Sequence, residues 1–346
     1  MSTDQIDTRL RNHILISIVN ARMNKSHAQE VSLRPIVVIS KCLEFEACRY
    51  NGQMIGFELV HQLKDHVTFV PICPEVEIGL GTPRDPIKIV RRRNDLHLVQ
   101  PSTGRDITTQ MQSFGRTFVE SLEEVDGFIL KSRSPSCGIK DVKLYTGPQG
   151  EMASEKTVGL FAAEVLSRFG GLAIEDEGRL TNLRLREHWL TKLYLHARFR
   201  GLRHAPSVSA LVEFQAKNKL LFMAYHQTAM REMGRVVANH DKLPIDKVIQ
   251  EYYRVLLSAV AKPARVTSHI NAIEHAMGYF KDKLSPVEKR HFQALIQRYR
   301  NGKLPLSSVL TVLNSWVERF DEVYLRQQTY FAPYPAELAD LSDSGR

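Results

Sequence analysis

The stretch "RPIVVISKCLEFEACRYNG" (34–52) decides the fold of the first half of this 346-residue chain. Four consecutive β-branched residues, 36–39, follow a proline and lead into polar residues, a pattern typical of a buried strand that ends in a loop. An apolar run without alternation is expected where both faces of a strand are covered, as in parallel sheets. The first cysteine, Cys42, lies just beyond this strand.

Two more strands of the same kind follow, "HVTFVPI" (66–72) and "DGFILKS" (126–132). Apolar residues at helical spacing precede each of them, in 57–66 and 107–125. The alternation of strands and helices predicts a parallel sheet with helices on its faces.

Residues 86–100 differ, because they predict two short strands around Asn94 and Asp95, a hairpin attached to the α/β body. The arginines at 91–93 favour a solvated hairpin edge over a binding patch. Residues 155–171 predict a further helix that ends at a double glycine.

From residue 185 onward the pattern is helical, with segments separated by Pro and Gly. The sequence therefore predicts an α/β, Rossmann-like N-terminal domain with a mostly parallel sheet, followed by an all-α helical C-terminal domain. The expected helices cover 185–202, 207–238, 245–260, 266–284, 286–302 and 306–320. The expected parts are an N-terminal extension (1–32), the α/β domain (33–183), the helical domain (184–335) and a C-terminal tail (336–346).

Charge divides the chain in the same way. Residues 184–346 hold 25 Lys and Arg against 15 Asp and Glu, whereas residues 1–183 hold 22 against 23. A basic half indicates a polyanionic partner such as nucleic acid, with a solvated basic surface as the alternative. No run approaches the roughly 20 apolar residues of a membrane span, and "ILISIV" (14–19) is too short for a signal peptide, so a cytoplasmic protein is expected.

Three of the four cysteines follow strands. Cys42, Cys73 and Cys137 each lie just past one of the three predicted strands. The carboxyl ends of parallel strands share one sheet edge, so these thiols are predicted to converge. A small buried hydrophobe is the alternative for any one of them. Zinc sites favour paired cysteines at short spacing, which are absent from the sequence, so an iron–sulfur cluster is the better interpretation.

The fourth cysteine, Cys48, lies six residues beyond Cys42 on the same loop. It could be a fourth ligand or point away. If it does not bind, one iron is left open for substrate, which distinguishes a catalytic site from a closed one.

In order and spacing, "ISKCL…CRYNG", "VPICPEVEIGLGTPRDPI" and "LKSRSPSCG" resemble the motifs of the 2-thiouracil desulfidase family (TudS) over about residues 33–180. The chain departs from that pattern at Glu44, Phe45 and Glu46. The second half, with "EFQAKNKLLFMAYHQ", "NHDKLP" and "YLRQQTYFAPYP", is similar to the YbgA-type domain. The combination of the two domains resembles the RudS proteins, which are desulfidases associated with the removal of sulfur from 4-thiouridine in tRNA.

The resemblance implies a [4Fe–4S] cluster held by Cys42, Cys73 and Cys137, with the fourth iron free and Cys48 not required. It implies a non-redox reaction in which a thiolated uracil, above all 4-thiouridine in tRNA, gives uridine and sulfide. The soft thiocarbonyl sulfur would bind the open iron while water attacks the ring carbon.

Proton transfer in such a reaction needs a partner, and Glu75 is the strongest candidate, since Pro74 can turn its carboxylate toward the cysteines. The alternative is a loop carboxylate that pairs with Arg84 or caps an amide. Ser134 is the candidate on the substrate side, and Ser136 is a second hydroxyl for the base or a cluster sulfur. Each serine alone is more often a turn residue.

The three residues that directly follow Cys48 are candidates for binding the thiolated base. Arg49 and Asn51 could orient the ring, and Tyr50 could stack on it, although "YNG" is also a plain turn signal. In the helical half, Phe214, Leu221 and Met223 are predicted to be core. The candidate phosphate contacts, expected as a polar cluster on one helix plus loop cations, are Lys217, Lys219, His226, Arg231, Lys242 and Lys303.

Two other hypotheses remain open from the sequence. One is a desulfidase of free thiouracil bases whose helical domain serves stability or assembly. The other is a non-enzymatic iron–sulfur or zinc protein that binds nucleic acid, for which Cys48 would be a fourth ligand.

Overall fold

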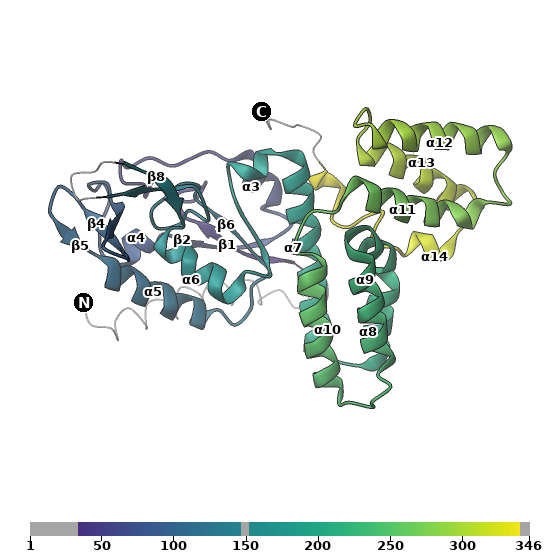
Figure 1. Cartoon of the computed structure of the whole chain (residues 1–346), viewed down its shortest axis with the longest axis horizontal. Coiled ribbons are helices and arrows are strands. Elements are labelled where there is room, and N and C mark those ends of the chain that lie inside the picture. The colour runs from purple at the N-terminus through teal and green to yellow at the C-terminus, as the bar shows by residue number, and fades with distance from the viewer. Residues whose placement is uncertain (1–33, 147–151, 340–346) are drawn as a thin grey trace. The chain divides into compact units, whose positions relative to one another are not determined.

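The structure is a computed structural model that describes residues 34–146 and 152–339 (Figure 1). The chain forms two compact units, of which the second is Arg198–Ala336 and the first comprises the residues before it and those from Glu337 on. The boundary between Ala197 and Arg198 lies inside a long helix, and the sequence predicted it at 183/184. The predicted extension (1–32) and the tail beyond residue 339 lie outside the described residues. Each unit is considered by itself below.

The first unit is built on a four-stranded sheet in the order β2-β1-β6-β9, in which every pair is parallel. This confirms the predicted sheet and its three strands, with Val38 of β1 opposite Val70 of β2 and Phe128 of β6. The edge strand β9 was not predicted. It is only four residues long and ends in Glu-Asp, so it has no apolar run that would indicate a strand. The strands are β1 (Ile36–Ser40), β2 (Thr68–Ile72), β6 (Gly127–Leu130) and β9 (Ala173–Asp176).

A second sheet has the order β5-β4-β3-β7-β8. It contains the predicted hairpin, in which Arg92 of β3 pairs with Asp95 of β4. The prediction of a helix from residue 155 was wrong at its start, because Val142 pairs with Thr157 in β8 and the helix begins only after Gly159. The strands are β3 (Lys88–Arg92), β4 (Asp95–Gln100), β5 (Arg105–Asp106), β7 (Val142–Tyr145) and β8 (Met152–Thr157).

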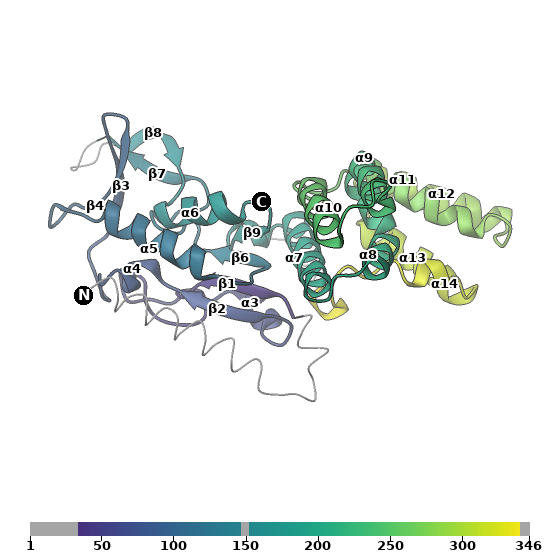
Figure 2. The same ribbon diagram turned by 90° about the horizontal axis from the view of Figure 1, so that it is seen from below.

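Two long helices, α5 (Thr108–Ser121) and α6 (Leu160–Phe169), pack side by side (Figures 1 and 2). Phe118 and Phe161 join them in one core with Val38 and Phe128 of the parallel sheet. This unit also contains the short helices α3 (Glu58–Leu63) and α4 (Pro74–Glu77), the 3₁₀ turn η2 (Arg179–Thr181) and the first part of the long helix α7 (Leu183–His204), up to Ala197.

The remainder is helical, as predicted. Within the described residues, no helix is both long and apolar enough to cross a membrane. Phe214, Leu221 and Met223 are buried, which confirms the predicted core rows. The helices are α7 (Leu183–His204), α8 (Val208–Lys217), α9 (Lys219–Ala238), α10 (Ile245–Ala259), α11 (Val266–Met277), α12 (Pro286–Arg300), α13 (Leu306–Arg319) and α14 (Val323–Arg326), with 3₁₀ turns η3 (Gly278–Phe280) and η4 (Ala336–Leu338).

The single helix predicted over 207–238 is broken at Asn218 in the structure. The Asn218 side chain donates to the carbonyl of Phe214 (2.8 Å), and the amide of Leu220 donates to the side chain of Gln328 (3.1 Å). Because Gln328 lies 108 residues further along the chain, helical periodicity could not reveal this break.

Candidate iron–sulfur site

The loops that follow β1, β2 and β6 enclose one cavity of about 480 Å³. Ser40 of β1 pairs with Ile72 of β2, so the two strands end at the same level and their loops leave the same edge of the sheet. The cavity is therefore at the sheet edge where the sequence predicted it. Its lining includes Cys42, Cys48, Cys73 and Cys137.

The four thiols are buried, with Cys42 and Cys73 each 8% exposed, Cys137 6% and Cys48 1%. A hydrogen bond with Cys48, together with burial, raises the pKa of the Cys73 thiol. Burial raises the pKa of Cys137. Thiolates at these positions therefore need a bound cation to be stable, as metal-ligating cysteines do.

The role of Cys48 is sharpened by its position. Its thiol is hydrogen-bonded to Cys42, which raises the pKa of Cys48 to about 11, and it also contacts the thiol of Cys73. Cys48 thus faces the cysteine group, so its orientation alone does not separate a ligand from a neighbour.

The donor set fits a cluster better than a single ion. Among the described residues, no group of three or more His, Cys, Asp or Glu side chains is placed to hold one metal ion. A four-iron cluster has a different requirement, because each thiolate binds a separate iron and the ligands stand further apart. Among the described residues that line the cavity there are four thiols and no imidazole, which agrees with a sulfur-ligated cluster.

Glu75 is the second residue of α4, which begins at Pro74 directly after Cys73, and Pro74 at the first helical position fixes the turn. Both of its oxygens are engaged. Arg84 donates to Oε2 through Nε (2.9 Å) and Nη2 (2.6 Å), and Ser136 Oγ donates to Oε1 (2.8 Å). The pairing with Arg84 that the sequence left as an alternative is present, and Glu75 also lines the cavity.

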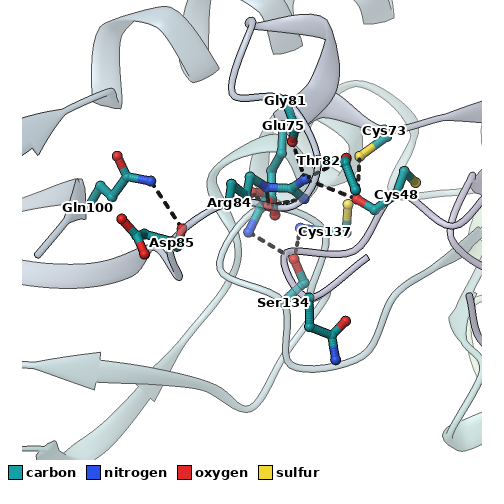
Figure 3. Close-up of polar contacts among 12 residues, drawn as sticks. Cys48, Cys73, Glu75, Gly81, Thr82, Arg84, Asp85, Gln100, Ser134 and Cys137 are labelled. Atoms are coloured by element: carbon teal, nitrogen blue, oxygen red, sulfur yellow. Dashed lines mark hydrogen bonds and ion pairs between the residues drawn. The ribbon is translucent and has the colours of Figure 1, made fainter. Parts of the chain in front are cut away.

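Arg84 donates hydrogen bonds to several groups beside the cavity (Figure 3). Besides Glu75, its Nη1 donates to the carbonyls of Cys48 (3.0 Å) and Gly81 (2.7 Å). Its side chain is only 4% exposed, and that of Glu75 is 12% exposed. One guanidinium therefore fixes both the carboxylate and the loop that carries Cys48.

Replacing Arg84 with Gln is expected to lower the free energy of unfolding by about 3 kcal/mol, because it leaves a buried carboxylate without its charge partner. Denaturant unfolding of the cluster-free protein would measure the change. Arg91→Gln is the matched control, since its partner Glu155 is 61% exposed and the pair should have no measurable effect. Equal stability of the two variants would contradict the assigned role of Arg84.

The two serines occupy different positions. Ser134 lines the cavity, and its Oγ accepts from the amides of Ser136 (3.2 Å) and Cys137 (3.1 Å), so it shapes the turn. The Ser134 hydroxyl is also hydrogen-bonded to the Cys137 side chain, which lowers the pKa of that thiol against the larger opposing effect of burial. Ser136 is fully buried and does not line the cavity. Any influence of Ser136 on a substrate would therefore pass through Glu75.

Of the base-binding candidates, Arg49 and Tyr50 line the cavity and Asn51 does not. The Arg49 guanidinium lies 5.7 Å from the Tyr50 ring centroid, and Tyr50 is 43% exposed. The Asn51 side chain is exposed and bonded to Gln53, which is a turn role.

The residues that depart from the family pattern anchor the loop rather than line the cavity. The Glu44 carboxylate accepts from the amide of Phe57 and pairs with His61 (2.8 Å), which ties the loop to α3. Glu46 forms an ion pair with Lys41. Neither carboxylate is part of the cavity wall.

The prediction that Lys217 lies on the same helix as Lys219, His226 and Arg231 was wrong. Lys217 ends α8 and pairs with Glu213 (2.5 Å), whereas Lys219 begins α9. α9 is kinked at His226, whose Nδ1 accepts from the amide of Ala229 (3.1 Å). The candidates that are exposed are Lys219, His226, Arg231, Lys242 and Lys303.

Sequence reasoning missed several polar residues of the cavity wall. Ser40, at the end of β1, accepts from the amide of Lys131 (2.9 Å). Lys131 forms an ion pair with Glu177, and Arg133 lines the cavity beside it. The signal was available, because both basic residues flank serines in "KSRSPSCG" itself.

Family models match both halves of the chain. The model of the family described as 2-thiouracil desulfurase matches residues 37–177, and that of a family described as protein of unknown function, DUF1722, matches residues 219–335. The resemblance seen in the sequence is thereby confirmed.

Individual relatives cover similar shares. The uncharacterized protein YbgA of Escherichia coli K12 is 29% identical over 152 residues, 44% of this chain and 89% of that protein. The uncharacterized protein YbbK of Bacillus subtilis 168 is 28% identical over 155 residues, 43% of this chain and 99% of that protein. The solved structure of the [4Fe–4S]-dependent thiouracil desulfidase TudS is 26% identical, with coverage of 42% of this chain and 93% of that one and a TM-score of 0.34. Residues 37–177 are thus similar to the 2-thiouracil desulfurase family, and residues 219–335 to the DUF1722 family.

Proposed function

We propose that the chain is a [4Fe–4S]-dependent desulfidase that converts 4-thiouridine in tRNA to uridine and sulfide. The observation that carries the proposal is the cavity in which three cysteines from three strand ends meet Glu75, within a region that matches the 2-thiouracil desulfurase family. The net reaction is hydrolysis: the C=S bond is replaced by C=O, and water supplies the oxygen and the two protons of hydrogen sulfide.

Cys42, Cys73 and Cys137 would hold the cluster, because they come from three different loops around one cavity. When bound, the cluster supplies an iron with an open position, a soft acceptor suited to a thiocarbonyl sulfur. The surrounding chain buries the thiols and keeps bulk water away from them.

Glu75 would handle the proton of the attacking water. It is the one carboxylate in the described lining of the cavity. Arg84 occupies both lone pairs of Oε2, whereas Ser136 occupies one lone pair of Oε1, so Oε1 can still accept a proton or hydrogen bond from water. Ser134, which lines the cavity, would donate a hydrogen bond from its hydroxyl to the substrate once the Cys137 thiolate is bound to iron.

Replacing Cys48 with Ala is expected to leave the iron and sulfide content of the purified protein unchanged, because three ligands and an open iron suffice in this proposal. Iron analysis and the visible spectrum, both under anaerobic conditions, would measure this. Loss of the cluster to the extent seen in a Cys137 variant would favour the closed, non-enzymatic alternative, for which the contacts of the Cys48 thiol with Cys42 and Cys73 are the supporting observation.

tRNA as the carrier is supported by the basic composition of the second half and by exposed cations on the second unit. Lysine and arginine bind phosphates without reading the base, which would position a tRNA while the first unit acts on one nucleotide. In the alternative, free thiouracil is the substrate and these cations play no part in turnover.

Replacing Lys219, Arg231 and Lys242 together with Ala is expected to raise the KM for 4-thiouridine in tRNA. The slope of log KM against log salt should fall by about 0.9 for each phosphate that the variant no longer neutralises. Turnover of free 4-thiouracil should not change. Lys64→Ala, an exposed lysine of the first unit, is the control. Equal turnover of tRNA by the triple variant and the unmodified protein would exclude this surface as the tRNA site.

A further inference from the structure

The edge strand β9 brings a carboxylate to the end of β6. Leu130 of β6 pairs with Asp176 of β9, so the two strands end at the same level. The residues that follow them, Lys131 and Glu177, therefore lie side by side, and they form an ion pair. The side chain of Lys131 is 19% exposed and that of Glu177 is 12% exposed, so solvent screens this pair less than it screens a surface pair.

Ser132 links the ammonium to the carboxylate. Lys131 Nζ donates to Ser132 Oγ (2.9 Å), and Ser132 Oγ donates to Glu177 Oε1 (2.7 Å). The amide of Ser132 donates to Glu177 Oε2 (2.8 Å), and the amide of Lys131 donates to Ser40 Oγ (2.9 Å). Neighbouring side chains thus fix both the main chain and the head group of Lys131.

The Lys131 ammonium has one donor left for the cavity. An ammonium group carries three N–H donors. Glu177 and Ser132 take two of them, and the third has no partner in the part of the chain that the structure describes. Lys131 and Ser132 both line the cavity. The third N–H is therefore available to a molecule bound there.

The proposed reaction needs an acid as well as a base, because sulfur leaves more readily once it carries a proton. The arginines of the lining cannot supply that proton, since a guanidinium stays protonated in proteins, whereas a lysine ammonium can release one. Glu75 follows β2 and Lys131 follows β6, and these strands lie on either side of β1. The candidate base and the lysine therefore reach the cavity from different loops.

The other lysine of the described lining, Lys41, is placed differently. Its partner Glu46 is 47% exposed, so water screens that ion pair. No serine is recorded between its ammonium and that carboxylate, in contrast to the arrangement of Lys131, Ser132 and Glu177. Lys131 is thus the lysine whose ammonium is both enclosed and oriented.

We propose that Lys131 is the general acid of the desulfidase reaction and donates a proton to the departing sulfur. Water gives one proton to Glu75 as its oxygen bonds to the ring carbon. The carbon–sulfur bond then breaks, its electron pair stays on sulfur, and sulfur takes the proton of Lys131 and leaves as hydrogensulfide. The second proton of the water restores the ammonium by way of solvent as the C=O bond forms. Glu75 releases its proton to solvent, and no electrons are gained or lost.

The inference rests on the proposed desulfidase function and adds a second catalytic residue to it. The test uses the full-length holoenzyme and two variants, Lys131→Arg and Lys131→Ala. The substrate is whichever of 4-thiouridine in tRNA and free 4-thiouracil the unmodified protein converts. Sulfide release is divided by the cluster content, measured as iron and acid-labile sulfide, so that partial loss of the cluster does not lower the value.

Both variants are expected to lower kcat about 10²- to 10⁴-fold, the usual contribution of a general acid. Lys131→Arg is the sharper variant, because arginine keeps a cation beside Glu177 but cannot release a proton. Full turnover by Lys131→Arg would show that positive charge alone is sufficient, and it would overturn the proposal. Lys140→Arg is the control and should not change kcat, since Lys140 is 49% exposed and lies outside the cavity lining.

Methylammonium separates proton transfer from a purely structural role. A small amine can enter the space that Lys131→Ala vacates and supply the missing proton, so it is expected to raise the turnover of this variant but not that of Lys131→Arg. Absence of rescue in Lys131→Ala assigns Lys131 a structural role and overturns the proposal. If the unmodified protein converts neither substrate, the desulfidase proposal fails, and the role of Lys131 in it fails as well.

Discussion

Replacing Cys137 with Ser is expected to abolish both the cluster and desulfuration. Cys137 is 6% exposed and lies in the apolar core of the first unit, at the end of the turn that Ser134 caps. The substitution keeps the shape of the side chain but removes the thiolate that iron requires. Loss of a residue that only supports a metal ligand reduces activity about 10- to 100-fold, so loss of the ligand should exceed that.

Iron content, acid-labile sulfide and the visible spectrum, all measured under anaerobic conditions, would follow the cluster, and release of sulfide would follow turnover. Far-ultraviolet circular dichroism separates cluster loss from misfolding. The Cys48→Ala variant is the matched control, since Cys48 is also buried in the same cavity. Full iron content in Cys137→Ser would show that Cys137 is a packing residue, the alternative that its burial also allows.

The sequence predicted the parallel sheet and the gathering of the cysteines because both depend on local patterns. A strand buried on both faces is visible as a β-branched run, and residues that follow such strands share an edge whatever the rest of the chain does. Cys42, Cys73 and Cys137 therefore could be placed together without any knowledge of the intervening segments.

The polar wall of the cavity could not be predicted in the same way. Arg84 reaches the carbonyl of Cys48 across 36 residues, and Ser136 reaches Glu75 across 61. Such contacts depend on how the loops are folded, and no periodicity records them. The same holds for Arg133, whose left-handed backbone conformation is unusual for an arginine.

The prediction missed β8, a short strand of the second sheet, for a related reason. β8 contains charged residues of both signs and is held by pairing with β7 rather than by an apolar face that periodicity could detect. The sequence predicted a helix from residue 155 because the strongly apolar α6 begins only three residues after β8 ends.

Replacing Glu75 with Gln is expected to lower kcat about 10²- to 10⁴-fold, the usual contribution of a general acid or base, while the iron content stays the same. The amide can still accept from Ser136, so the wall keeps much of its shape, but it cannot take a proton from water.

Glu77→Gln is the control for this second prediction, because Glu77 lies on the same short helix α4 but is not part of the cavity lining. Arg84 loses its charge partner in Glu75→Gln, so the assay belongs at a temperature well below the unfolding transition of that variant. Ser136→Ala retains the carboxylate and removes one hydrogen bond, so its effect should be smaller than that of Glu75→Gln. Should Glu75→Gln keep full turnover with an intact cluster, Glu75 is a structural partner of Arg84, and proton transfer must come from water or from another group at the cavity.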